Sequence, residues 1–196
     1  MRKTLAALAA GFSLLASTAL AAPEPADPKK QTAWHLYLTA KEAFDMKQAE
    51  GAKVLFIDVR EPVEMMFAGF TDVVDVNVPF LLVDPTKFNP SKPVLAMEPN
   101  PAFRDGVLKA LEARGLDMST PVLLMCRSGG ERGAPSARAL EGTGLEKVYV
   151  VVDGFEGDSD KSNPTGPWRT VNGWKNSGLP WSYDLNPAKV YLRPAP

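Results

Sequence analysis

The sequence predicts an α/β domain built on a mostly parallel sheet of about five strands, with helices on both faces. Short apolar runs of strand length, such as "KVLFIDV" (53–59) and "KVYVVV" (147–152), are typical of strands buried on both faces. Stretches with helix start and stop signals separate these runs. Alternating strands and helices favour parallel pairing, because each crossover helix returns the chain to the same end of the sheet.

Local signals justify the elements in order. Thr39 followed by Glu42 forms a capping box that opens a helix, and Gly51 ends that helix. Pro62 and Pro135 suit the first turns of two further helices. The expected strands are 34–38, 53–59, 73–78, 121–125 and 147–152, and the expected helices are about 39–50, 61–70, 102–114 and 135–140.

Residues 80–101 are predicted to be an excursion from the core. This stretch and the residue before it carry six prolines, which no regular helix or central strand would tolerate. After residue 152 the chain is rich in Gly, Pro and Trp, which predicts a long ordered wrap with little regular structure. Before residue 34, the proline-rich residues 22–33 predict a flexible lead-in.

The first residues resemble a secretory leader. Arg2 and Lys3 precede an apolar stretch over 5–15, and a small-residue site at 19–21 follows. That stretch is shorter than the roughly 20 residues that cross a bilayer, so we expect a signal peptide over 1–21 rather than an anchor. Cleavage there changes the formal net charge from -1 to -3. We therefore expect a periplasmic or secreted protein that has no membrane contact after the leader is removed.

Composition excludes several classes of protein. The 196 residues are 45% hydrophobic and 23% charged, which is ordinary for one globular domain and too apolar for a disordered chain. No basic block stands out, so nucleic acid is not an expected partner. One cysteine and one histidine, His35, form no ligand cluster of recognisable spacing, and no metal site is expected.

The single cysteine, Cys126, is the candidate catalytic residue. Exported proteins usually pair their cysteines, and an odd one indicates either an intermolecular disulfide or a reactive thiol. It ends an apolar run and begins "CRSGGERGAPSARAL". A strand that turns through Gly129 and Gly130 into a helix directs backbone N–H groups at a common centre, which forms an anion nest. Arg127 and Arg132 on this loop would stabilise a thiolate.

This loop resembles the active-site loop of the rhodanese superfamily of sulfurtransferases. "VLFIDVREPVEMMFAGF", "VNVP" and "NGWKNSGLPW" resemble further motifs of that family in the same order, over residues 34–184. The resemblance implies a rhodanese-like domain over 34–184, with insertions near 80–101 and 155–172 and a tail at 185–196. It is greatest to single-domain exported bacterial rhodaneses.

The resemblance implies a sulfurtransferase of the thiosulfate type. Cys126 would take a sulfur atom from an anionic donor such as thiosulfate, hold it as a persulfide without any other cofactor, and pass it to cyanide or a thiol. Backbone N–H groups of the loop would hold the anion, and the two arginines would hold the oxyanion end of the donor. The expected substrate-binding residues are Arg127, Ser128, Gly129, Gly130, Glu131 and Arg132.

The spacing within the loop keeps an alternative open. Many rhodaneses have six residues from Cys to Arg, whereas Cys126 to Arg132 spans seven. The longer spacing resembles the cell-cycle dual-specificity phosphatases and related arsenate reductases, which bind a tetrahedral oxyanion. Those phosphatases have His before the cysteine, where this chain has Met125, and an inward-facing Glu131 would oppose phosphate. A non-catalytic binding module or a redox carrier is a third interpretation.

Other polar residues are expected to have supporting roles. Asp58 ends a predicted strand and is a candidate for a position near the cysteine loop, and Arg60 is grouped with it. Arg60 and Glu64 are at helix-neighbour spacing, which predicts an ion pair that fixes the strand-to-helix turn. Nothing in the sequence assigns His35 as a base, since an ionised thiol needs none. We expect residues 155–172 to form a wall of the pocket that, with 80–101, restricts acceptors.

Overall fold

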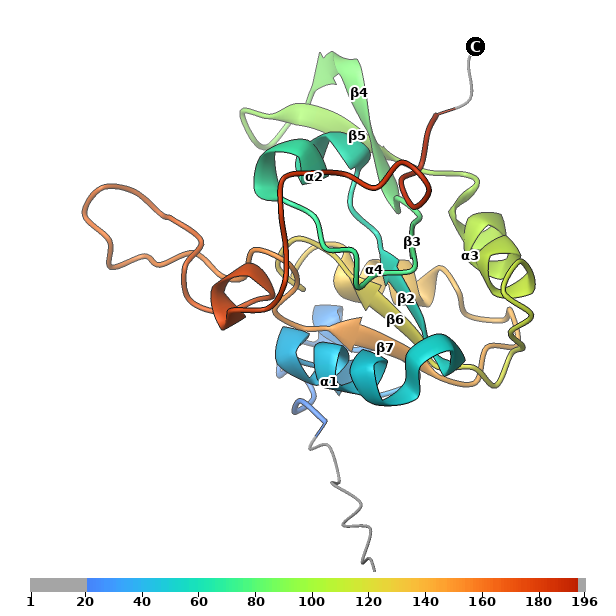
Figure 1. Cartoon of the computed structure of the whole chain (residues 1–196). Coiled ribbons are helices and arrows are strands. Elements are labelled where there is room, and N and C mark those ends of the chain that lie inside the picture. The colour runs from blue at the N-terminus through green and yellow to red at the C-terminus, as the bar shows by residue number, and fades with distance from the viewer. Residues whose placement is uncertain (1–20, 194–196) are drawn as a thin grey trace, which may run out of the picture.

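The computed structural model describes residues 21–193 (Figure 1). The predicted leader lies outside the described residues apart from Ala21, as do the last three residues. Within the described part, no helix is long and apolar enough to cross a membrane.

Five strands form one sheet in which every pair is parallel, as the sequence predicts (Figure 1). The strand order is β1-β7-β6-β2-β3, so β6 and β2 are central neighbours. The central strands are buried along their whole length, which explains their continuous apolar sequences. The strands are β1 (Tyr37–Leu38), β2 (Leu55–Asp58), β3 (Val76–Asn77), β6 (Val122–Met125) and β7 (Val148–Val151).

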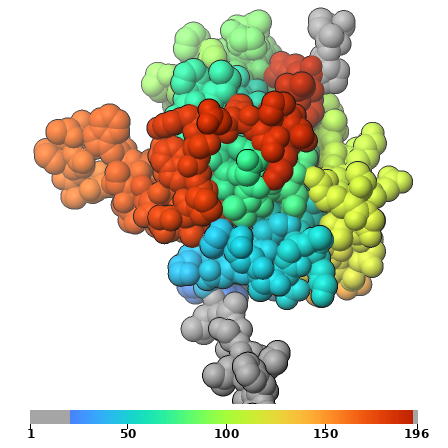
Figure 2. All heavy atoms as spheres, in the orientation of Figure 1, coloured from blue at the N-terminus to red at the C-terminus, as the bar shows by residue number. Residues whose placement is uncertain are grey.

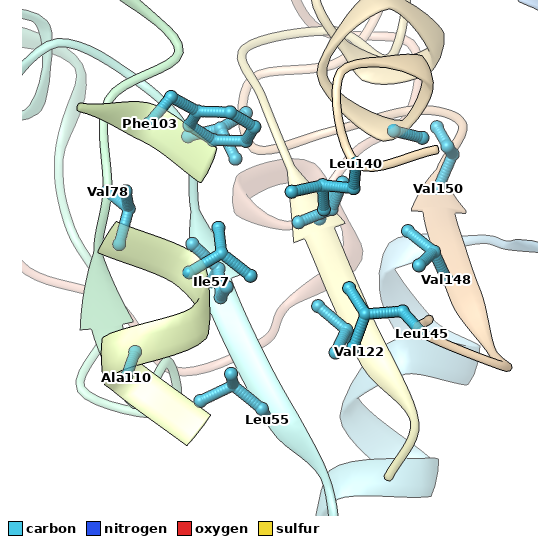
Figure 3. Packing of buried hydrophobic residues seen from close by; sticks show 14 of the residues in the cluster. Leu55, Ile57, Val78, Phe103, Ala110, Val122, Leu140, Leu145, Val148 and Val150 are labelled. Carbon is cyan, nitrogen blue, oxygen red and sulfur yellow. The ribbon is translucent and has the colours of Figure 1, made fainter. Parts of the chain in front are cut away.

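Helices cover both faces of this sheet, as expected. On one face, α3 (Phe103–Glu112) and α4 (Gly133–Arg138) pack on the sheet side chains that Figure 3 shows. On the other face, α1 (Ala40–Glu50) and α2 (Pro62–Ala68) pack on the alternate side chains of the same strands. Each buried Val, Leu or Ile contributes about 1.5–3 kcal/mol to this packing. Three short 3₁₀ turns complete the helical elements: η1 (Pro28–Lys30), η2 (Gly51–Lys53) and η3 (Lys175–Ser177).

The helix boundaries follow the predicted signals closely. The Thr39 side chain accepts a hydrogen bond from the Glu42 backbone N–H, and the Glu42 carboxylate accepts one from the Thr39 backbone N–H. The predicted capping box is therefore present. Gly51 ends α1 with a positive φ of 57°, which only glycine adopts at no steric cost. A second capping box, which was not predicted, begins α2: the Glu64 carboxylate accepts from the backbone N–H of Glu61 at 3.0 Å.

The proline-rich stretch forms a hairpin outside the central sheet. β4 (Leu81–Phe88) and β5 (Leu95–Pro99) pair antiparallel in a separate two-stranded sheet, at the top of Figures 1 and 2. Its register shifts between Asp84 and Phe88, where Pro85 interrupts the ladder. A strand pair was not predicted here, because prolines exclude central strands but are compatible with an irregular pair exposed at the surface.

The segment after β7 wraps around the domain with one turn of 3₁₀ helix, as predicted. Trp174 is completely buried, and its ring packs edge-on against Phe44 with centroids 5.7 Å apart. Its Nε1 donates to the Pro180 carbonyl at 2.9 Å. Farther along, the Asn77 backbone N–H donates to the Lys189 carbonyl at 2.7 Å, so the end of the described chain lies against β3. The Trp174 indole therefore anchors the wrap, because it buries a large apolar area.

Candidate active site

Cys126 lies directly after β6, at the carboxyl edge of the sheet, as the sequence predicts. Its side chain is completely buried. The neighbouring strand β2 runs alongside in register, with Asp58 opposite Met125 and the Val59 N–H donating to the Met125 carbonyl at 2.9 Å. Ligands of parallel α/β sheets bind at this edge, so the position suits a reactive group.

The loop after Cys126 presents a row of backbone N–H groups without protein acceptors. Within residues 21–193, the amides of 127–132 donate no hydrogen bond to any backbone or side-chain oxygen. Such groups need a partner or water, because an unsatisfied N–H is costly when it is removed from solvent. This row is therefore suited to holding an anion next to the thiol.

Gly129 is the residue that lets this loop turn. Its φ is +66°, and a Cβ atom there would lie 1.7 Å from the Val152 carbonyl oxygen. Gly130 has no positive φ, so only one of the two expected glycines uses this conformational freedom. Gly154 of the same segment also packs closely against the loop, since a Cβ atom there would lie 2.6 Å from the Cys126 carbonyl oxygen. The loop is thus clamped against the chain that follows β7.

We expect Gly129→Ala to displace the loop and to lower the free energy of unfolding by about 1–3 kcal/mol, since it adds left-handed strain and a clash with backbone. Gly130→Ala is the matched control, because its new Cβ would meet only the Ser128 Oγ, at 3.5 Å. Urea unfolding of both variants measures the difference. Equal stabilities would show that the close approach of Gly129 to Val152 does not constrain the loop.

Arg132 is held by Glu64 of α2 in a two-pronged ion pair. Arg132 Nη2 donates to Glu64 Oε1 at 2.7 Å, and Nη1 donates to Oε2. The side chains are only 9% and 23% exposed. The end of the cysteine loop is therefore fixed to α2, and both Nη atoms of the arginine expected to hold the donor already have a carboxylate partner.

The charges of this pair stabilise one another. Burial disfavours the ionised form of Glu64, but the hydrogen bond and charge of Arg132 outweigh it and lower the pKa of Glu64. Burial likewise opposes the charge on Arg132, whereas Glu64, Cys126 and Asp58 raise its pKa. The thiol and Asp58 thus lie within electrostatic reach of the guanidinium.

The lowered pKa of Glu64 predicts a pH dependence. A carboxylate that is more acidic when folded stabilises the fold above its unfolded pKa, near 4.5, and loses that contribution as the pH falls through the folded value. We expect acidification below about pH 4.5 to destabilise the wild type more steeply than Glu64→Gln. Thermal unfolding at a series of pH values tests this. Parallel curves for the two proteins would contradict the assignment.

Arg60 is paired with Asp58 and not with Glu64, so the predicted Arg60–Glu64 pair is wrong. Arg60 Nη2 donates to Asp58 Oδ2 at 2.6 Å, both side chains are completely buried, and the guanidinium lies 4.0 Å from the Phe155 ring centroid. Arg60 precedes the N-cap of α2, so helix-neighbour spacing does not apply to it. Its Nη1 has no partner within the described chain. The Arg60–Asp58 pair fixes the strand-to-helix turn after β2. The sequence predicted this role for Arg60, but with Glu64 as its partner.

Arg127 points to the segment that follows β7. Its Nε donates to the Glu156 carboxylate, and the Glu156 N–H donates to the Arg127 carbonyl at 2.8 Å. The Phe155 N–H donates to the Cys126 carbonyl at 2.9 Å. The first residues of the 155–172 segment therefore border the cysteine loop, and the rest projects from the body in orange in Figure 2.

The Glu131 side chain points away from the loop into solvent, so its charge does not face the anion site in the way that would oppose phosphate. Its side chain is 80% exposed and accepts from Lys92 Nζ of the hairpin. The hydrogen bond from Lys92 lowers the pKa of Glu131, and the charges of Arg132 and Arg169 add to this effect. Sequence patterns did not identify Glu64 as the partner of Arg132, nor Lys92 as the partner of Glu131, because neither contact has a local pattern.

His35 lies away from this edge. It precedes β1, at the amino end of the sheet, and its largely exposed ring has Nδ1 2.7 Å from Glu24 Oε1. Residues 21–193 contain no cluster of three His, Cys, Asp or Glu side chains that would hold a metal ion.

Comparisons with known proteins agree with the architecture. No protein-family model matches the chain, and a search of curated proteins found no match. Among solved structures, the crystal structure of Rv0390 from M. tuberculosis is 28% identical, with a TM-score of 0.56, over 76% of this chain and 97% of that one. The solution structure of a polysulfide-sulfur transferase homodimer from Wolinella succinogenes is 22% identical, with a TM-score of 0.43, over 74% and 77%. The chain thus has a rhodanese-like α/β fold.

Proposed function

We propose that this protein is a sulfurtransferase that carries a sulfur atom as a persulfide on Cys126. The observation that carries the proposal is the row of unpaired amides at 127–132 beside the single thiol. A persulfide and an anionic sulfur donor such as thiosulfate are both stabilised by N–H groups, and the N–H groups of this loop are already in place. The sequence motifs shared with rhodaneses support the same reaction.

The transfer has two displacement steps. The Cys126 thiolate attacks the outer sulfur of thiosulfate, a new S–S bond forms, and the old S–S bond breaks so that sulfite leaves with the electron pair. Cyanide or a thiolate then attacks the outer persulfide sulfur, forming thiocyanate or a new persulfide and regenerating the Cys126 thiolate. Electrons and atoms balance with no further oxidant or reductant.

Each loop residue has a role in this reaction. Amides from Arg127 to Arg132, through Ser128, Gly129, Gly130 and Glu131, hold the anionic sulfur. Arg132 supplies positive charge while Glu64 fixes its position. Arg127 is more exposed and lies at the rim with Glu156, so it would meet the oxyanion end of an incoming donor. Asp58 and Arg60 are positioning residues beneath the loop.

A second candidate is an oxyanion-directed phosphatase or arsenate reductase. The seven-residue span from Cys126 to Arg132 favours it, because a longer loop encloses a larger anion. The outward position of the Glu131 carboxylate removes one objection to phosphate, whereas the engagement of both Arg132 Nη atoms by Glu64 leaves fewer donors for it. The sulfur reaction is the better supported, since the thiol and the unpaired amides supply its nucleophile and anion site even with both Arg132 Nη atoms engaged by Glu64.

A substrate panel separates these functions. We expect purified protein to form thiocyanate from thiosulfate and cyanide, and not to hydrolyse an aryl phosphate or reduce arsenate. Phosphate release or arsenite formation without thiocyanate would assign the second function. No turnover with any substrate, in a folded protein, would favour a binding module. We also propose that the protein is exported, to the periplasm or beyond the cell, and a fusion to a reporter that is active only after export tests it.

A further inference from the structure

Three segments border the cysteine loop, and they are attached to it with very different strength. α2 is attached through the buried Glu64–Arg132 pair. The segment after β7 is attached through two backbone hydrogen bonds, from Phe155 and Glu156 to the first residues of the loop. Buried ion pairs and backbone hydrogen bonds hold fixed geometry, so neither segment is free to move away alone.

One exposed contact attaches the hairpin to the cysteine loop, and elsewhere Arg193 Nη2 donates to the Val83 carbonyl at 3.2 Å. Within the described residues, the only hydrogen bond or ion pair between 81–99 and the loop 126–132 joins Lys92 to Glu131. These two side chains are 55% and 80% exposed. Exposed pairs compete with water and are screened by salt, so this contact opens readily. As strands, β4 and β5 pair only with each other, in a sheet separate from the central one.

The target of this contact is unusual. Glu131 lies in the loop whose span is one residue longer than in many rhodaneses, and its carboxylate points away from the anion site toward the hairpin. Cys126 itself has no exposed surface in this arrangement. An acceptor must reach the outer sulfur of Cys126, and so one bordering segment must give way when a bulky acceptor arrives.

We propose that the β4–β5 hairpin is a latched cover that sets the size of acceptor able to reach Cys126, with Lys92 and Glu131 as its specificity-determining latch. The role in choosing a sulfur acceptor rests on the proposed function, whereas the control of access to the Cys126 thiol does not depend on it. A small acceptor such as cyanide needs only a small opening at the buried thiol, which the closed latch allows. A protein or peptide thiol requires the hairpin to swing from the loop.

Thiol alkylation tests access without requiring any sulfur chemistry. Purified full-length protein is treated with iodoacetamide, which is small, and with a maleimide carried on a polyethylene glycol chain, which is bulky. We expect Lys92→Ala to raise the rate with the bulky reagent, relative to the small one, about two- to fivefold, the range set by loss of one exposed ion pair. High salt should move the wild type toward the same ratio.

A matched control lies on the same hairpin. Lys87 is also an exposed lysine, but it pairs within the hairpin, with Asp84 at 3.0 Å, and contacts no residue of the loop by a hydrogen bond or ion pair within the described chain. Lys87→Ala should therefore leave the ratio of the two rates unchanged. The charge-reversed double variant Lys92→Glu with Glu131→Lys should restore the wild-type ratio, since it rebuilds the pair in the opposite sense.

The possible outcomes separate the latch from the proposed function. An unchanged ratio in Lys92→Ala, an equal change in Lys87→Ala, or no recovery in the double variant would overturn the latch. Thiocyanate formation at the wild-type rate with a selective gain for a reduced protein thiol in Lys92→Ala would support its role in acceptor choice. If the alkylation ratio changes as expected but no sulfur donor modifies Cys126, the cover stands and the proposed function fails.

Discussion

Cys126→Ser is expected to abolish persulfide formation and thiocyanate production, to below detection. A serine hydroxyl at this position would not ionise at neutral pH, so it offers no nucleophile to the sulfur donor. The change in side-chain volume is small, and we expect the fold to persist. Thiocyanate assays and far-UV circular dichroism on the same preparation measure both properties.

His35→Ala is the control for Cys126→Ser, because His35 lies at the opposite end of the sheet and is largely exposed. We expect this variant to keep wild-type turnover. Sulfur transfer that survives in Cys126→Ser would contradict the assignment of Cys126 outright. Loss of turnover in both variants would place an essential group at the amino end of the sheet, against the geometry of the site.

The second large effect is expected at Glu64. Glu64→Ala leaves the Arg132 charge at a mostly buried position without its partner, which costs about 3–5 kcal/mol in the free energy of unfolding. Turnover should fall as well, because Arg132 then no longer fixes the end of the cysteine loop. Urea unfolding measures the first effect, and thiocyanate formation under folding conditions measures the second.

An exposed pair provides the comparison. Lys41 and Asp45 lie one turn apart on α1, 2.9 Å from each other, with both side chains largely exposed. Asp45→Ala should change the free energy of unfolding by no more than about 0.5 kcal/mol. The double variant Glu64→Met with Arg132→Met should recover much of the stability lost in Glu64→Ala, whereas its turnover should stay low because the Arg132 charge is gone. A Glu64→Ala cost as small as that of Asp45→Ala would contradict the role of the buried pair.

The parts of the fold that sequence alone predicts are those that local patterns determine. The capping box at Thr39 and Glu42 is a contact between residues three apart, and Gly51 ends α1 by its own conformational preference. The buried strands β2 and β6 are recognisable because both faces are covered. These local signals are sufficient to place Cys126 at the carboxyl edge of the sheet.

Tertiary partners could not be predicted in the same way. Glu64 accepts from an arginine that is 68 residues away in sequence, and Lys92 lies 39 residues from Glu131. Helix-neighbour spacing instead suggested Arg60 for Glu64, although the chain is not yet helical at Arg60. The β4–β5 hairpin was not predicted either, because prolines indicate where regular structure is interrupted but not how two irregular segments pair.

The extra residue of the cysteine loop illustrates both what sequence predicts and what it does not. Its presence is visible in the sequence, and it raised the alternative of a larger oxyanion. The Glu131 carboxylate accepts a hydrogen bond from Lys92 of the hairpin, and the hairpin carries no motif that would identify this contact. The structure therefore connects the longer loop with the hairpin through Glu131 and Lys92, which the spacing from Cys126 to Arg132 does not reveal.

Intact-protein mass after incubation with thiosulfate tests the central claim most directly. We predict that the wild type gains the mass of one sulfur atom on Cys126, and that added cyanide removes this sulfur as thiocyanate. A folded protein whose Cys126 remains alkylatable, yet gains no sulfur from thiosulfate, polysulfide or any other donor tested, would contradict the account.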